Sequence, residues 1–230
     1  MALALDDRLD ALTTALNHMS HQVEKLVKDS LTLVGGVDID ELAEDVIRGD
    51  LVIDRQEVEI EEKAIEMLAL HQPRAGDLRV IVAVLKINND LERIGDHAAN
   101  IARAAGRLGR LETKVPVPPE LGEMGRIACG MLGDALDAFV HESTDEAAAV
   151  RERDDRVDQL LDSLVRIMLT HMPEHHISGC LEVILIGRNL ERIADLATNI
   201  AEDVIFMVQG RTVRHGVRLD RAGGGPKANS

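Results

Sequence analysis

The sequence predicts an all-α protein made of two similar halves. Apolar residues make up 45% of the 230 positions, yet the chain has only two Phe and no Trp or Tyr. The core must therefore come from Leu, Ile, Val, Ala and Met, a set that favours helices over strands. Residues 91–102, LERIGDHAANIA, return at 190–201 as LERIADLATNIA with nine identical positions. The chain thus contains an internal duplication.

Helical periodicity justifies three elements in the first half, at about 5–35, 38–72 and 76–110. In each of them apolar residues recur at steps of three and four, which places them on one face of a helix. Residues 112–120, ETKVPVPPE, then place three prolines within four positions. Proline disfavours helix and stiffens the chain, so we predict a linker and a domain boundary there.

The same order of elements follows the linker, with helices expected at 121–140, 144–171 and 176–209. The final twenty residues hold five Lys or Arg against one Asp, together with a glycine cluster. We therefore predict a first domain at 1–111, the linker at 112–120, a second domain at 121–210 and a basic, disordered tail at 211–230.

Charge and composition narrow the class of protein. A net charge of −15 opposes binding to a phosphate backbone, and two Phe with no Trp or Tyr provide no aromatic surface on which bases could stack. We expect no nucleic-acid partner. Two cysteines make no disulfide framework, no signal segment opens the chain, and no apolar run is long enough to span a bilayer. We expect a cytoplasmic protein that reaches a membrane only through partners.

The duplication preserves a pair of like charges four residues apart, Glu92 with Asp96 and Glu191 with Asp195. Like charges at this spacing on a helix repel by roughly 0.2–0.5 kcal/mol. The presence of the pair in both copies therefore indicates that the acids have a function or a compensating partner. A helical wheel places them, with Asn100 and Asn199, opposite the apolar stripe, where they point out of the bundle.

A second acidic pattern, Asp-x-x-(Ile/Val)-Asp, lies on the helix that precedes each copy of the repeat. It comprises Asp50 and Asp54 in the first half, and Asp154 and Asp158 in the second. Each half therefore presents two rows of carboxylates on consecutive antiparallel helices, which can converge on one surface.

Two interpretations of these acids stay open. Arg93 precedes Asp96 by three residues and Arg192 precedes Asp195 by three, so each aspartate has a possible ion-pair partner on a solvated face. Alternatively, the acids bind a cation or a partner. Oxygen ligands suit magnesium, manganese, calcium or iron better than a structural zinc.

Enzyme chemistry finds little support. The chain contains no Glu-x-x-His, which removes the ferritin-like di-iron motif, and no nucleophile carries a recognisable motif. We predict that the protein is not an enzyme. The rival hypotheses are a metal-dependent phosphohydrolase that uses the same carboxylates and a purely structural helical spacer.

The sequence resembles the PhoU proteins, regulators of bacterial phosphate uptake. The similarity spans about residues 5–215, and four segments carry it: DLERIGDHAANIA at 90–102, NLERIADLATNIAEDV at 189–204, HQPRAGDLR at 71–79 and VQGRTVRH at 208–215.

This resemblance implies two pseudo-symmetric three-helix bundles, a homodimer, and surface metal sites at the Glu/Asp-x-x-x-Asp motifs. The motifs map to Glu92, Asp96, Glu191 and Asp195, with Asp50, Asp54, Asp154 and Asp158 as neighbours. The expected metal is a divalent or ferric ion (Mg, Mn, Fe or Zn). We assign the flanking Asn100, Asn199, Arg93 and Arg192 to partner binding.

The resemblance also implies a role rather than a reaction. Such proteins act when phosphate is plentiful, linking the ATPase subunit of a Pst-type phosphate transporter to a PhoR-type sensor kinase, and keep the phosphate-starvation response off. One departure concerns the metal sites. Asn189 stands where the first half has Asp90, so the second-half site has the weaker support.

Overall fold

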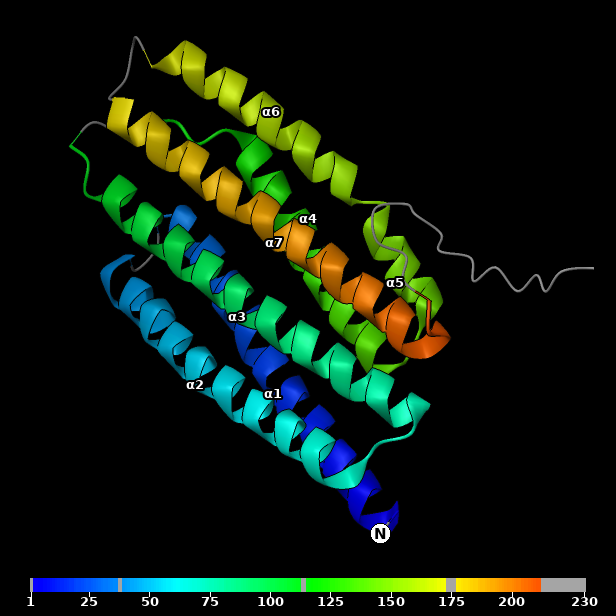
Figure 1. The fold of residues 1–230 in the computed structure, drawn as a ribbon. Helices are drawn as coiled ribbons and strands as arrows, with labels where there is room; N and C mark the ends of the chain where they lie inside the picture. The colour runs from blue at the N-terminus through cyan, green and yellow to red at the C-terminus, as the bar shows by residue number, and fades with distance from the viewer. Residues whose placement is uncertain (1, 37–38, 113–114, 173–176, 212–230) are drawn as a thin grey trace, which may run out of the picture.

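The computed structural model describes residues 2–36, 39–112, 115–172 and 177–211, and its described elements are all helices (Figure 1). This confirms the all-α prediction. The first half contributes α1 (Ala2–Val34), α2 (Ile39–His71) and α3 (Ala75–Gly109). The second half contributes α4 (Pro119–Val140), α5 (Thr144–Arg151), α6 (Asp154–His171) and α7 (Ile177–Gln209). The predicted tail lies outside the described residues, apart from residue 211.

The helix expected at 144–171 is wrong as one continuous element, because the chain turns between α5 and α6. Val150 and Val157 are buried, but the core-facing positions between them hold Arg153 and Asp154. No apolar side chain anchors the helix there, and backbone bonds of the tighter i→i+3 type replace the regular pattern around Arg153. The turn places Asp154 in the first turn of α6, where the helix dipole favours a carboxylate.

The fourth helix starts at Pro119, so residues 119–120 of the predicted linker are helical. Proline fits the first turn of a helix because the amide hydrogen that it lacks has no partner inside the helix.

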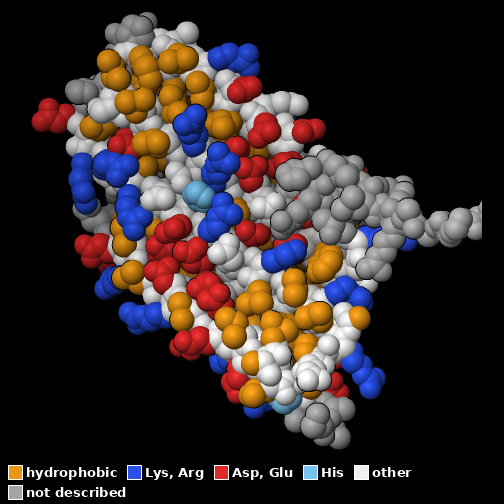
Figure 2. Space-filling model, viewed as in Figure 1, with side chains coloured by type: hydrophobic (Ala, Val, Ile, Leu, Met, Phe, Trp, Pro, Cys, Tyr) orange, Lys and Arg blue, Asp and Glu red, His pale blue; other side chains and the backbone are white. Residues whose placement is uncertain are grey.

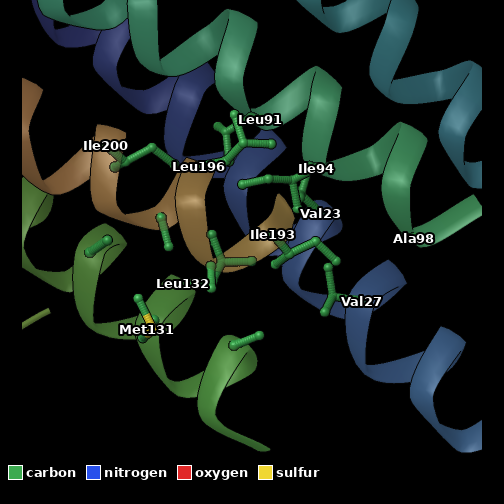
Figure 3. Close-up of a cluster of buried hydrophobic side chains, with 14 of the residues drawn as sticks. Val23, Val27, Leu91, Ile94, Ala98, Met131, Leu132, Ile193, Leu196 and Ile200 are labelled. Carbon is green, nitrogen blue, oxygen red and sulfur yellow. The ribbon is translucent and has the colours of Figure 1, made fainter. Parts of the chain in front are cut away.

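The two halves pack against each other along the repeated element. α3 and α7 run antiparallel and form the most extensive contact between any two helices (Figure 1). Ile94 and Ile193, which occupy equivalent positions of the repeat, are both fully buried in one cluster, with Val23 of α1 and Met131 of α4 close by (Figure 3). The two halves therefore share one hydrophobic core. The pseudo-two-fold axis that relates them passes near Ile94 and Ile193.

Polar contacts join α3 to α7 along this seam. Lys86 Nζ lies 2.9 Å from Asp203 Oδ1, His97 Nδ1 lies 2.9 Å from Asn189 Oδ1, and Arg107 binds both carboxylate oxygens of Glu182 at 2.7 and 2.8 Å. The residue number of the α7 residue falls from one pair to the next as the residue number on α3 rises, so these three contacts fix the antiparallel register. Within the described part of the chain, no helix is long and apolar enough to cross a membrane.

Candidate functional site

The structure brings the acidic residues of α2 and α3 together. We call Asp50, Asp54, Glu57, Glu92 and Asp96 the first-half cluster. Burial raises the pKa of Glu92, and the negative charges of Asp96, Asp54, Glu57 and Asp50 raise it further. The two carboxylate rows therefore meet on one surface.

Asp50 is the buried member of this cluster. It is only 4% exposed, and its Oδ1 atom has no hydrogen-bond partner. The close approach of α2 to α3 depends on Gly95, because a Cβ atom there would lie 3.0 Å from Asp50 Oδ1. Burial, followed by the charges of Asp96 and Asp54, raises the pKa of Asp50 from 3.8 to about 6, although Arg103 opposes the rise.

We predict that Asp50→Asn stabilises the cation-free protein at neutral pH. Asp50 holds its proton more tightly in the folded state than in the unfolded chain, so its contribution to folding is least favourable above pH 6 and improves as the pH falls toward 4. The raised pKa gives the direction of the effect, and because solvent screens part of the penalty the gain in stability should be about 1–3 kcal/mol.

Urea unfolding at several pH values, with a chelator present, measures this difference. The advantage of Asp50→Asn over wild type should be largest above pH 6 and vanish near pH 4. Asp10→Asn, at an exposed position of α1, is the control. An equal effect of the two substitutions on the free energy of unfolding at every pH would show that the ionised Asp50 carboxylate does not destabilise the folded state.

The acids of α6 and α7 also face one another. We call Asp154, Asp158, Glu191 and Asp195 the second-half cluster. Burial raises the pKa of Asp154, and the charges of Asp195 and Asp158 add to the rise. For Glu191 the largest effect of a neighbouring charge comes from Arg192, which lowers its pKa against the stronger effect of burial.

The two arginines of the repeat behave differently. Arg192 contacts Asp195 Oδ2 at 3.2 Å and Glu191 Oε2 at 3.4 Å. Arg93 instead contacts Asp90 Oδ1 at 3.5 Å, and none of the ion pairs among the described residues joins it to Asp96. The expected pair of arginine and aspartate three residues apart is therefore found in the second half, and it is wrong for the first.

The two asparagines also differ in their surroundings. Asn100 is exposed and accepts a hydrogen bond from Arg103 Nη1 at 2.9 Å. Asn199 lies with Arg93 between two open cavities of about 410 and 440 Å³. Lys86 also lines the larger cavity, and Arg151 lines the smaller one.

Sequence reasoning missed Arg151 and Lys86. Arg151 contacts Glu202 Oε1 at 3.3 Å. Arg151 ends α5 and its partner lies on α7, so no local spacing indicated this contact. Lys86 meets Asp203 of the other half, a contact that no local spacing indicates.

The first half supplies donors of the type that a hard cation prefers, because carboxylates of α2 and α3 lie near enough to raise one another's pKa and the buried Asp50 Oδ1 has no hydrogen-bond partner. As the side chains stand in the described residues, no three Asp, Glu, His or Cys groups are placed to hold one metal ion. Binding would therefore require the exposed carboxylates to turn toward the ion.

Comparison with known proteins settles the family. The family model of the PhoU domain matches the chain twice, at residues 16–105 and 121–204. The chain belongs to the PhoU family. A Rhizobium meliloti protein named phosphate-specific transport system accessory protein PhoU homolog is 35% identical over 209 residues, which cover 90% of this chain and 88% of the relative.

Solved PhoU structures share the fold. The crystal structure of PhoU from Pseudomonas aeruginosa aligns with a TM-score of 0.85 and 37% identity, covering 89% of this chain and 99% of that one. The phosphate transport system regulatory protein PhoU from Streptococcus pneumoniae aligns with a TM-score of 0.84 and 28% identity, covering 91% and 99%. Two PhoU-domain matches in one chain agree with the duplication read from the sequence.

Proposed function

We propose that this chain is a cytoplasmic regulator of phosphate uptake that acts as an adaptor, not as an enzyme. Its partners are the ATPase subunit of a Pst-type phosphate transporter and a PhoR-type sensor kinase, and its action when phosphate is plentiful keeps the starvation response off. Membership of the PhoU family supports this role, as do relatives named accessory proteins of phosphate-specific transport. We also propose that the protein forms a homodimer.

One surface observation carries the proposal, namely a face of α3 and α7 on which apolar ends flank a charged middle (Figure 2). At the start of α7, Ile177, Leu181 and Leu185 are 59%, 47% and 43% exposed. At the other end, Leu78 of α3 and Val208 of α7 are also exposed. Large exposed apolar patches on a folded protein mark interaction sites.

The pseudo-two-fold relation accounts for the presence of two patches. Leu78 and Ile177 occupy equivalent positions of the duplication, 99 residues apart, and both are exposed. Because α3 and α7 are antiparallel, these positions lie at opposite ends of the face. Such a face suits a partner that offers two similar contact surfaces, as a two-fold symmetric dimer does.

The charge between the patches specifies the partner further. In the same view, acidic and basic side chains together occupy the middle of the face, between the apolar ends (Figure 2). A complementary partner surface has apolar contacts beside basic residues, and attraction between opposite charges raises the association rate in a manner that salt weakens.

Binding of the purified chain to the ATPase subunit, and to the cytoplasmic part of the kinase, tests the proposal. Affinity should fall as salt rises, and Glu92→Lys with Asp96→Lys should weaken binding while the far-ultraviolet spectrum stays helical. The matched control is Asp6→Lys with Asp10→Lys, a pair with the same spacing on an exposed part of α1. Equal loss from both pairs, or no binding to either partner, would count against the adaptor.

A further inference from the structure

We infer that the outer face of α2 joins two copies of this chain, and that the two α2 helices pair antiparallel about Val58. The inference rests on the proposed homodimer and names its interface. It does not depend on the adaptor role, which uses the α3–α7 face.

Three large apolar side chains mark this surface, which we call the α2 stripe. Leu51, Val58 and Ile65 follow one another at steps of seven and are 52%, 48% and 54% exposed. Steps of seven keep them on one side of the helix, with a drift of only about 20° per step. Each lies two positions before a buried core residue, and two positions on an α-helix are about 200° apart. The α2 stripe therefore faces away from the core.

The second half shows that the fold does not require the α2 stripe. The alignment of the two Asp-x-x-(Ile/Val)-Asp patterns places Asp155 of α6 at the position of Leu51, and Asp162 at that of Val58. Both aspartates are exposed. Because the equivalent helix carries charge at these positions, packing within the chain does not explain the apolar residues of α2. Exposed apolar residues that form one patch mark a contact with another molecule.

The α2 stripe is placed well for a contact between two helices. It runs about 21 Å along α2, and Val58 lies near the middle of this 33-residue helix. Antiparallel pairing about Val58 therefore overlaps the two helices along most of their length. α2 lies at the edge of the bundle, where it packs on α1 and α3 with its opposite side (Figure 1).

Charge beside the α2 stripe favours a second copy as the other molecule. Arg55 and Glu62 are exposed on the same side of α2 and take part in no ion pair within the described part of the chain. When two α2 helices pair antiparallel about a two-fold axis at Val58, Arg55 comes close to the partner's Glu62, and symmetry makes this ion pair twice. The same operation places Leu51 against the partner's Ile65. Parallel helices would instead set each charge against its own copy, so antiparallel pairing is favoured.

Sedimentation of the full chain over a range of concentrations tests this interface. Wild type should be dimeric at high concentration and dissociate on dilution. Val58→Asp sets two carboxylates against each other at the axis and should raise the dissociation constant of the dimer about tenfold or more. The matched control is Leu169→Asp, at the position of α6 that corresponds to Ile65 and is 56% exposed. This control should leave dimerisation unchanged, and both variants should keep the helical far-ultraviolet spectrum.

Exchange of charges tests the antiparallel arrangement. Arg55→Glu alone and Glu62→Arg alone should each weaken the dimer, because each variant places like charges at both contacts. An equal mixture of the two variants should form a mixed dimer, in which both contacts again join opposite charges.

The contradicting results separate the interface from the homodimer and from the adaptor role. Wild type that stays monomeric at every concentration would overturn the homodimer and its interface together. A wild-type dimer that Val58→Asp leaves intact would overturn the interface alone, and so would a mixture of the charge variants that dimerises no better than its components. Binding to the transporter ATPase subunit tests the adaptor role independently.

Discussion

Deleting the gene should leave phosphate-starvation genes active in phosphate-rich medium. An adaptor that conveys the state of the transporter to the kinase is needed to hold the kinase inactive, so its loss removes the repressing signal altogether. This is the largest effect that we expect, because expression of the starvation genes changes from off to on. A transcriptional reporter of a starvation gene, read in high and low phosphate, measures it.

Complementation separates the acidic surface from the rest of the molecule. Wild type should restore repression, and so should Asp6→Lys with Asp10→Lys. Glu92→Lys with Asp96→Lys should fail to restore it at an equal protein level. A deletion strain that represses its starvation genes normally would remove the regulatory role.

The second large effect concerns the apolar end of the α3–α7 face. Leu181 is 47% exposed at the start of α7, so its burial by a partner would contribute ~1 kcal/mol or more. Leu181→Asp loses this contribution and also buries a carboxylate at the interface. Affinity for the partner that covers this patch should fall about tenfold or more, equivalent to ~1.4 kcal/mol.

Val140→Asp is the matched control for that substitution. Val140 is 56% exposed at the end of α4, a helix that lies behind α7 in Figure 1. Val140→Asp should change the affinity little. The free energy of unfolding of both variants should stay close to that of wild type, because substitutions at exposed positions usually change it by no more than about 0.5 kcal/mol. Equal binding by Leu181→Asp and wild type would show that the patch lies outside the interface.

Local sequence patterns predicted most of the fold, because each helix buries a stripe with a regular period. The exception is the turn at residues 152–153. The sequence indicates this turn only by the absence of an apolar residue at the core-facing position between Val150 and Val157. One polar residue in an apolar stripe does not by itself predict that a helix ends. The residue pairs that join α3 to α7 could not be predicted either. The contacts Lys86–Asp203 and His97–Asn189 depend on the register between two segments that are far apart in the sequence.

The acidic rows were predictable because four-residue steps place Asp50 and Asp54, or Glu92 and Asp96, along one side of a helix. The burial of Asp50 was not, since it depends on how closely α2 approaches α3 at Gly95. The sequence also shows that Asp90 precedes Arg93 by three residues and that Asn189 takes this place before Arg192. Only the structure shows which carboxylate each guanidinium reaches.

Recovery of the tagged chain from cells grown in high and in low phosphate tests the adaptor role most directly. We expect the transporter ATPase subunit and the sensor kinase to be recovered with it in high phosphate, and Glu92→Lys with Asp96→Lys to reduce their recovery. The contradicting result is recovery of neither partner in either condition, together with hydrolysis of phosphate esters by the purified protein and loss of that turnover in the same variant.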